Sequence, residues 1–205
     1  MSPNLNSLAT LRRARETLQT ALVGLNDLHH DPKRRVAALS NVVVFGRAVT
    51  NVLENLRSSE PGFDEWYEPV SRALAADPLM KFFYGLRSRI LKRGETGTNN
   101  YTCVKRLSPV DIKRFPEPAN ARRFFIGDSL GGSGWVVEVS PGIVEHYYVD
   151  LPEEIGTAGL FFEDAPVASG AGGRHGADVV VLCEHYLIRM QGVLNDANGK
   201  FGPAF

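Results

Sequence analysis

Basic residues crowd the stretch LRSRILKRG, residues 86–94. They are Arg87, Arg89, Lys92 and Arg93, and Ser88 lies between the first two. Guanidinium and ammonium groups bind phosphate oxygens, and a positioned cation also stabilises the charge that develops during phosphoryl chemistry. The stretch therefore offers a candidate phosphate-binding site formed by these four cations.

A structural interpretation of the same stretch is available. Lys92 and Arg93 fall in the last turn of an expected helix, where cations complement the helix dipole. Gly94 follows as a natural left-handed C-cap. Together with Arg89, these cations share an exposed face by their spacing, so the basic end needs no ligand to explain it.

Arg87 is the exception within this stretch. It follows Phe83 by four residues and precedes Leu91 by four, which places its guanidinium beside the apolar stripe of the helix. A half-buried arginine requires an anionic or carbonyl partner. We expect that partner in the region Asn51–Glu54, or on the equivalent helix of a second protomer.

The first half of the chain must form the helices that position these residues. Leucines recur at helical spacing between residues 3 and 30, and a second apolar stripe follows Asp31-Pro32. A third helix is expected after Pro61-Gly62, and a fourth begins at Asp77-Pro78. The inward residues predicted for the second helix are Val36, Leu39, Val43, Val49, Leu53 and Leu56. The run NVVVF in that helix is β-branched, so a strand is an alternative there.

Beyond Gly94 the composition changes to that of strands and turns. Two runs flank Ser140-Pro141-Gly142 and predict an antiparallel hairpin, and the stretch GLFFED predicts a further strand. The covered hairpin residues are expected to be Trp135, Val137, Val139, Val144 and Tyr148. Residues 165–177 predict a mobile loop, and helical spacing returns at about 178–198.

These elements predict one elaborated α+β domain over residues 1–205. A mainly α-helical bundle, residues 3–93 with about 178–198, would pack in one core. A β-rich antiparallel insertion, about 99–164, would precede the last helix.

The run FDEWYEP…DPLMKFFYGLRSRILKRG, preceded by the helix FGRAVTNVLENL, resembles the HEPN superfamily of helical-bundle proteins. Many members are dimeric, metal-independent ribonucleases of toxin–antitoxin and antiphage systems. Their motif is an arginine, a polar residue, three further residues and a histidine. Arg87 and Ser88 match its first two positions, but Lys92 stands at the histidine position, so the R-x4-H motif is degenerate. The resemblance covers roughly residues 5–93 and implies a HEPN-like fold and a homodimer.

The substitution at Lys92 bears on catalysis. RNA cleavage by 2′-hydroxyl attack needs proton transfer near neutral pH, which histidine provides and lysine at its ordinary pKa does not. The resemblance together with this substitution therefore implies a non-catalytic, HEPN-like interaction module of a toxin–antitoxin or antiphage defence system, which binds RNA, phosphate or a partner protein. The alternative is a metal-independent ribonuclease whose composite site combines Arg87, Ser88 and Lys92 from two protomers.

Other motifs are weaker. GDSLGGSGW has glycines but lacks the lysine and the strand-to-helix context of a phosphate-binding loop, so a hairpin loop is the better interpretation. The five histidines show no metal-ligand spacing, and Cys103 and Cys183 stand far apart. We predict no cofactor and no metal site, and a buried Cys183.

The overall charge excludes a general attraction to nucleic acid or membranes. Acidic and basic residues number 23 each, so any such contact must use a local patch. No segment has about 18 uninterrupted apolar residues, and the first residues lack the apolar core of a signal peptide. The expectation is a cytoplasmic protein without a membrane partner.

Overall fold

The structure is a computed structural model that describes residues 5–166 and 177–203, and it has the α+β fold that the sequence predicts. The described chain divides into two compact units. Unit 1 comprises the residues up to 97, with 164–166 and 180–203, and it is helical. Unit 2 comprises residues 98–163 and 177–179, and it holds the antiparallel sheets. The predicted mobile loop, residues 165–177, lies largely outside the described residues.

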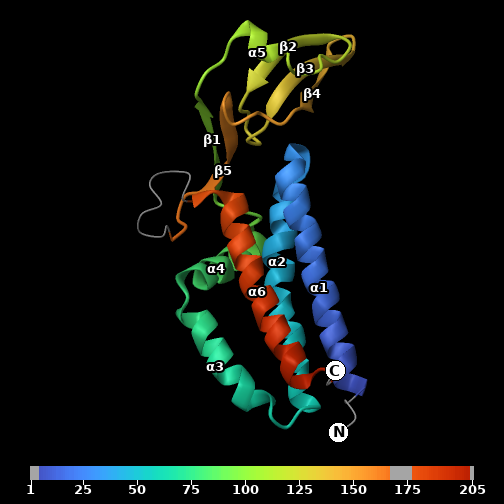
Figure 1. Cartoon of the computed structure of the whole chain (residues 1–205), viewed down its shortest axis with the longest axis vertical. Helices are drawn as coiled ribbons and strands as arrows, with labels where there is room; N and C mark the ends of the chain where they lie inside the picture. Colours follow the sequence, from blue (N-terminus) through green and yellow to red (C-terminus); the bar gives the residue numbers. More distant parts are fainter. Residues whose placement is uncertain (1–4, 167–176, 204–205) are drawn as a thin grey trace. The chain divides into compact units, whose positions relative to one another are not determined.

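Unit 1 is a bundle in which long helices run side by side (Figure 1). Its elements are α1 (Leu5–His30), η1 (Pro32–Arg34), α2 (Arg35–Leu53), η2 (Glu54–Ser58), α3 (Phe63–Ala76), α4 (Pro78–Arg93) and α6 (Val179–Phe201). The NVVVF run is therefore helical, because its valines fall within the helical period of α2 and not within a two-residue alternation.

Local chemistry sets the ends of these helices. The Asp31 side chain accepts a hydrogen bond from the backbone N–H of Lys33 at the start of η1. The Asp77 side chain accepts from the N–H groups of Leu79 and Met80 at the start of α4. Gly94 ends α4 with a φ of 70°, which suits glycine. The predicted starts of the second and fourth helices and the Gly94 cap are confirmed.

Two glycines allow helices to approach closely. A Cβ added at Gly24 of α1 would lie 2.8 Å from the Asn41 Cβ of α2. One added at Gly46 of α2 would lie 2.5 Å from Cε1 of Tyr186 in α6. Both distances are shorter than real Cβ contacts, so these positions have room for no side chain.

Aromatic contacts join α6 to the earlier helices. Tyr186 stacks on Phe83 of α4 with ring centroids 4.2 Å apart. Phe201 packs edge-on against Trp66 of α3 at 5.4 Å. Cys183 is buried in the same helix. The C-terminal helix thus packs against α2, α3 and α4 within unit 1.

One inward residue of α2 was predicted wrongly. Val36 is exposed, whereas Leu39, Val43, Val49, Leu53 and Leu56 are buried. Val36 lies in the first turn of α2, next to the connection from α1, and the buried residues of α2 begin only with Ala38 and Leu39. Periodicity places Val36 on the same side of α2 as the buried residues, but burial also requires another segment to pack against that turn of the helix.

Unit 2 contains a three-stranded sheet in the order β2-β3-β4 and a two-stranded sheet β1-β5, all antiparallel. Its elements are β1 (Thr98–Val104), α5 (Pro109–Ile112), β2 (Ala121–Ile126), β3 (Ser133–Ser140), β4 (Ile143–Tyr148) and β5 (Gly156–Phe162). The predicted hairpin is β3–β4, and the first four residues of GLFFED form the second half of β5. The glycine-rich stretch GDSLGGSGW joins β2 to β3, so its interpretation as a hairpin loop is confirmed.

Aromatic packing covers one side of the three-stranded sheet. Phe124 stacks on Phe115 at 5.1 Å and meets the buried Trp135 edge-on at 5.1 Å. Val139 and Val144, which were expected to be covered, are exposed. The β3–β4 register shifts between Glu138 and Ser140, so the regular alternation of faces does not extend to the tip of the hairpin.

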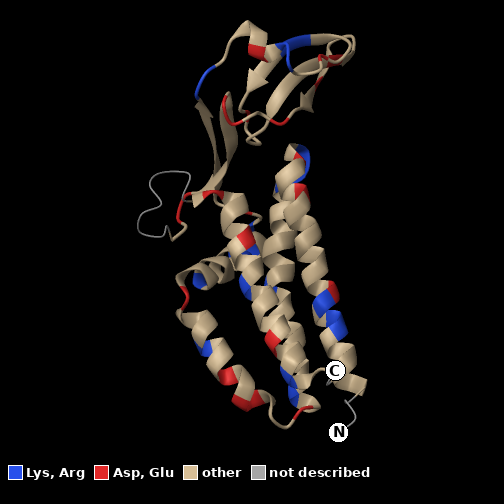
Figure 2. Cartoon of the chain, viewed as in Figure 1, with Lys and Arg blue, Asp and Glu red and all other residues tan. Residues whose placement is uncertain are grey.

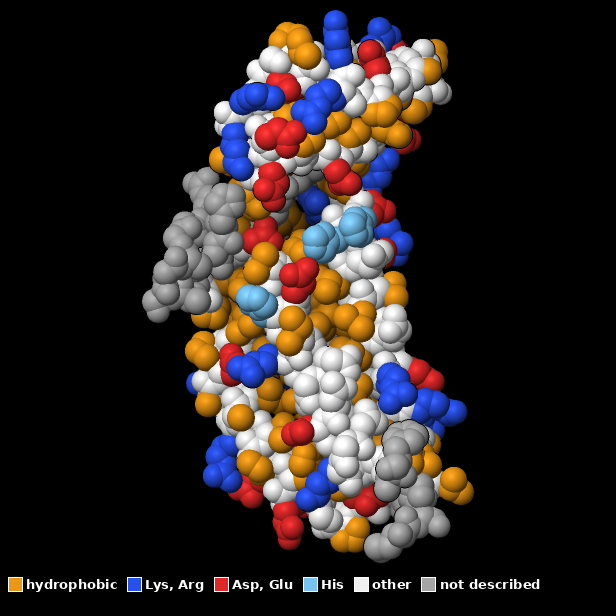
Figure 3. Space-filling model, viewed as in Figure 1, with side chains coloured by type: hydrophobic (Ala, Val, Ile, Leu, Met, Phe, Trp, Pro, Cys, Tyr) orange, Lys and Arg blue, Asp and Glu red, His pale blue; other side chains and the backbone are white. Residues whose placement is uncertain are grey.

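By length and composition alone, one helical stretch of the described chain, Pro32–Ser58, is long and apolar enough to cross a membrane. Its apolar residues include the buried stripe of α2, and core helices of globular proteins meet the same criterion. Apolar side chains also reach the surface of unit 1, as the face in Figure 3 shows. Val181 and Ile188 of α6 are among the exposed ones.

Candidate functional site

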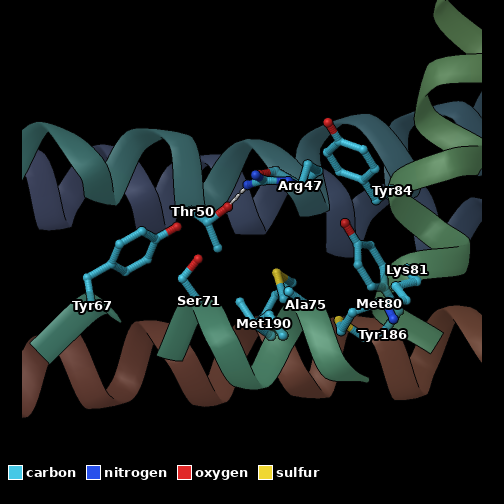
Figure 4. A pocket seen from close by; sticks show the side chains of 11 residues that line it. Arg47, Thr50, Tyr67, Ser71, Ala75, Met80, Lys81, Tyr84, Tyr186 and Met190 are labelled. Atoms are coloured by element: carbon cyan, nitrogen blue, oxygen red, sulfur yellow. Dashed lines mark hydrogen bonds between the residues drawn. The ribbon is translucent and has the colours of Figure 1, made fainter. Parts of the chain in front are cut away.

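A pocket of about 330 Å³ opens within unit 1 between α2, α3, α4 and α6 (Figure 4). Its volume is that of a small-molecule site. It is lined by Arg47 and Thr50 of α2, by Tyr67, Ser71, Leu74 and Ala75 of α3, by Met80, Lys81 and Tyr84 of α4, and by Tyr186 and Met190 of α6.

Arg47 contributes a guanidinium to the wall that α2 forms. Through Nη1 it donates hydrogen bonds to the hydroxyl of Thr50 and, at 2.9 Å, to Oδ1 of Asn51. Its Cζ also lies 5.9 Å from the ring centroid of Tyr84. All these partners are neutral, and within the described chain Arg47 forms no ion pair with a carboxylate. Nε and Nη2 are therefore available to an acceptor in the pocket.

Lys81 supplies a second positive charge at the pocket. Its side chain is exposed, and none of the described residues pairs with it. The eleven lining residues include these two cations and no carboxylate or histidine. An uncompensated charge of this sign favours an anionic ligand.

Tyr186 adds a buried hydroxyl. The residue is 2% exposed, and its hydroxyl oxygen has no hydrogen-bond partner within the described part of the chain. The hydroxyl points toward the side of the pocket where Arg47 and Tyr84 lie (Figure 4). Burial raises the pKa of Tyr186 well above its ordinary value, against the opposing charges of Arg47 and Arg87. The group is thus a neutral donor that lacks an acceptor.

The opposite end of the pocket is bounded by Tyr67. Its hydroxyl donates to Oε1 of Glu54 at 3.1 Å, and burial together with that carboxylate raises the pKa of Tyr67. Thr50 and Ser71 lie between this end and the cationic end (Figure 4). Methionines and α3 apolar residues complete the lining, so the pocket combines a cationic end, hydroxyl groups and an apolar wall.

A shallower groove along α3 shares Tyr67, Ser71 and Ala75 with this pocket. Its charges are paired: Arg57 contacts Asp64 at 2.8 Å, and Arg72 contacts Glu68 at 2.8 Å. Figure 2 shows both signs of charge along α3. This groove therefore lacks the charge excess of the pocket.

The predicted site residues of α4 have different surroundings. Ser88 donates from its hydroxyl to the Tyr84 carbonyl of its own helix, and Lys92 is exposed. Arg93 lies 3.9 Å from Glu95. Arg89 was expected to be a freely exposed cation, but only 33% of its side chain is exposed and it lies 3.7 Å from Asp164. The segment after β5 returns to unit 1 and supplies that carboxylate, which helical periodicity does not reveal.

Arg87 is half-buried, as its spacing suggested. Its Nε is buried and has no hydrogen-bond partner among the described residues, so the partner expected at Asn51–Glu54 does not bind it within one chain. Asn51 instead bonds Arg47, and Glu54 bonds Tyr67. The second alternative, a partner on another protomer, stays a prediction.

Sequence reasoning missed Arg47 and Tyr186. Arg47 lies four residues after Val43 and three before Thr50, both buried, so a charge within the inward stripe of α2 was a detectable signal. Tyr186 had no such signal, because an aromatic residue in an amphipathic helix normally belongs to the core. Only the packing of α6 brings it to the pocket.

A second polar cluster lies in unit 2, where the Asp128 carboxylate accepts several hydrogen bonds. Tyr148 donates from its hydroxyl at 2.6 Å, and Nδ1 of His146 lies 3.1 Å away. The backbone N–H groups of Leu130 and Gly132 donate to the other oxygen. Burial of the carboxylate acts against ionisation, but these hydrogen bonds together lower the pKa of Asp128. The cluster fastens the β2–β3 loop to β4.

Comparison with known families yields one model, described as Bacteriophage lambda protein ea47, that matches residues 17–107. The match spans less than half of the 205 residues, and it contains all of α2, α3 and α4. Three of the four helices that line the pocket therefore lie within it. Searches of curated proteins and of solved structures give no match.

Proposed function

We propose that this protein is a phage-associated, HEPN-like binding module whose helical unit holds a phosphate-bearing ligand of the nucleic-acid type without cleaving it. The similarity of residues 17–107 to a bacteriophage lambda family supports the association with phages. The observation that carries the binding role is the pocket lining, in which Arg47 and Lys81 face no carboxylate. Phosphate oxygens would accept hydrogen bonds from both.

The chemistry of the lining favours binding over catalysis. Histidine is the side chain best suited to proton transfer near pH 7, and none is among the described residues that line the pocket. Arg87 and Lys92 are five residues apart, which corresponds to roughly 140° around an α-helix. Within one protomer they therefore face different directions.

We also propose a homodimer formed through the helices. Val181 and Ile188 of α6 expose apolar side chains, and the buried Nε of Arg87 has no partner in the described chain. A second protomer that packs against α6 would cover these exposed apolar side chains. Sedimentation analysis of the purified protein tests this, and a monomer throughout the micromolar range would contradict it.

Binding is tested by titrating the full-length protein with fluorescent single-stranded RNA at fixed ionic strength, since phosphate contacts depend on salt. Arg47→Ala and Lys81→Ala should each weaken binding. A charge-assisted hydrogen bond contributes about 1.5–3 kcal/mol, so Arg47→Ala should cost roughly ten- to a hundredfold in affinity.

Arg72→Ala is the matched control, because it removes an exposed arginine that is paired with Glu68 and does not line the pocket. Equal losses for Arg72→Ala and Arg47→Ala would show that binding depends on general charge and not on the pocket. Metal-free degradation of RNA that Arg87→Ala abolishes, with the fold intact, would replace the binding role by the ribonuclease alternative.

A further inference from the structure

We infer that the pocket takes a terminal phosphomonoester together with its nucleoside, and not an internal phosphodiester of a strand. The inference rests on the proposed function and specifies its ligand. The same chemistry occurs in a free nucleoside 5′-monophosphate and at the 5′-phosphorylated end of an RNA.

The charge of the site fits a monoester. A phosphomonoester carries about −1.5 to −2 at pH 7, because its second pKa is near 6, whereas a phosphodiester carries a single negative charge. Arg47 and Lys81 together provide two positive charges, and no carboxylate among the described lining residues offsets them. A ligand group of nearly two negative charges balances the pocket.

The buried donors fit the same group. The Tyr186 hydroxyl lies in the pocket wall and finds no acceptor among the described residues, and the positive charges of Arg47 and Arg87 both act on it. Buried polar groups are almost always hydrogen-bonded, so an orphaned hydroxyl next to a pocket marks a missing partner. A terminal phosphate has three exposed oxygens, enough to accept from Arg47 and Tyr186 at once.

The remainder of the pocket fits a nucleoside. Met80 and Met190 offer apolar contact for a planar ring, and Tyr84 presents its ring at the cationic end. Thr50 and Ser71 carry hydroxyls farther along the pocket, where a ribose or a base edge would lie (Figure 4).

The size of the pocket limits how much of a strand can enter. At about 30 Å³ per molecule, 330 Å³ corresponds to roughly eleven waters, which is room for one small ligand. Tyr67 at one end and Tyr84 with Tyr186 at the other bound this space (Figure 4). A strand end can enter such a site, whereas a continuous strand would have to leave it again.

The test compares two single-stranded RNA oligomers of identical sequence, one with a 5′-phosphate and one with a 5′-hydroxyl, together with free nucleoside 5′-monophosphates. The wild-type protein should bind the phosphorylated end about tenfold or more tightly than the hydroxyl end. Tyr186→Phe should reduce that preference severalfold, because it removes a buried donor to the terminal phosphate. Arg72→Ala should preserve the preference.

Because Arg47 also bonds Thr50 and Asn51 within α2, Lys81→Ala provides a second variant whose exposed side chain is not part of the folded core. It too should reduce the preference. Competition by a free monophosphate at the same affinity as the oligomer would identify the free nucleotide as sufficient, and much weaker competition would identify the strand end; both support a monoester site.

Equal binding of the two oligomers, still dependent on Arg47, would overturn the monoester inference and leave the proposed function standing. Binding of neither oligomer nor monophosphate would overturn both.

Discussion

Replacing Tyr186 by phenylalanine should stabilise the ligand-free protein. A buried hydroxyl without a partner costs about 1–3 kcal/mol of desolvation, and the Tyr186 hydroxyl has no acceptor in the described chain. Phenylalanine removes that cost and keeps the ring that stacks on Phe83 at 4.2 Å. We expect the free energy of unfolding to rise by about 1–2 kcal/mol, and the melting temperature by about 3–6 °C for a chain of this size.

Urea unfolding followed by far-UV circular dichroism measures this change, because the helical signal reports mainly on unit 1. Tyr67→Phe is the matched control, since its hydroxyl donates to Glu54 at 3.1 Å. That substitution should lower the free energy of unfolding by about 1 kcal/mol. The two tyrosines line the same pocket, so opposite signs would isolate the effect of hydrogen bonding.

A loss of stability in Tyr186→Phe that matches the loss in Tyr67→Phe would refute this reasoning, because it would mean that the Tyr186 hydroxyl already has an acceptor in solution. A saturating ligand offers an internal check. It stabilises the folded state by mass action, and the wild type should gain more from it than Tyr186→Phe.

Three further predictions concern packing and pH. Gly46→Ala should destabilise unit 1 by about 1–3 kcal/mol, because its Cβ would meet Tyr186 at 2.5 Å. Gly192→Ala, which has open space around it, should instead stabilise by up to about 1 kcal/mol. Thermal melts in which the two variants shift the melting temperature in the same direction would refute the close approach of α2 and α6. Asp128→Ala should destabilise unit 2 by about 2–4 kcal/mol at pH 7. Because the pKa of Asp128 is lowered in the folded state, the stability that its carboxylate contributes should be lost as the pH falls below about 4. An acid unfolding profile that is the same for the variant and the wild type would contradict this. Above about pH 10 the wild type should lose stability relative to Tyr186→Phe. Burial raises the pKa of Tyr186 in the folded state, so at this pH the tyrosine ionises only in the unfolded chain. Curves of unfolding free energy against pH that run parallel for the two proteins from about pH 9 to 11 would contradict this.

Much of the fold was predictable because its signals are local. Proline after aspartate, glycine after the last helical turn and leucines at helical spacing each act within a few residues. They indicated the starts of the second and fourth helices and the end of α4, and the turn residues Ser140-Pro141-Gly142 indicated the β3–β4 hairpin. The errors occurred where local periodicity meets the end of an element: Val36 in the first turn of α2, and Val139 and Val144 beside the turn of the hairpin.

The candidate site depended on information that periodicity does not carry. The sequence by itself determined that Arg87 would be half-buried beside an apolar stripe, because helix geometry fixes the side of the helix on which it lies. Only the tertiary structure decided which charges remain unpaired: Arg89 meets Asp164, whereas Arg47 and Lys81 meet no described carboxylate. Tyr186 reaches the same pocket from a helix more than a hundred residues later in the chain. Pairing and burial depend on contacts between distant segments, so they are properties of the packed bundle and not of any single helix.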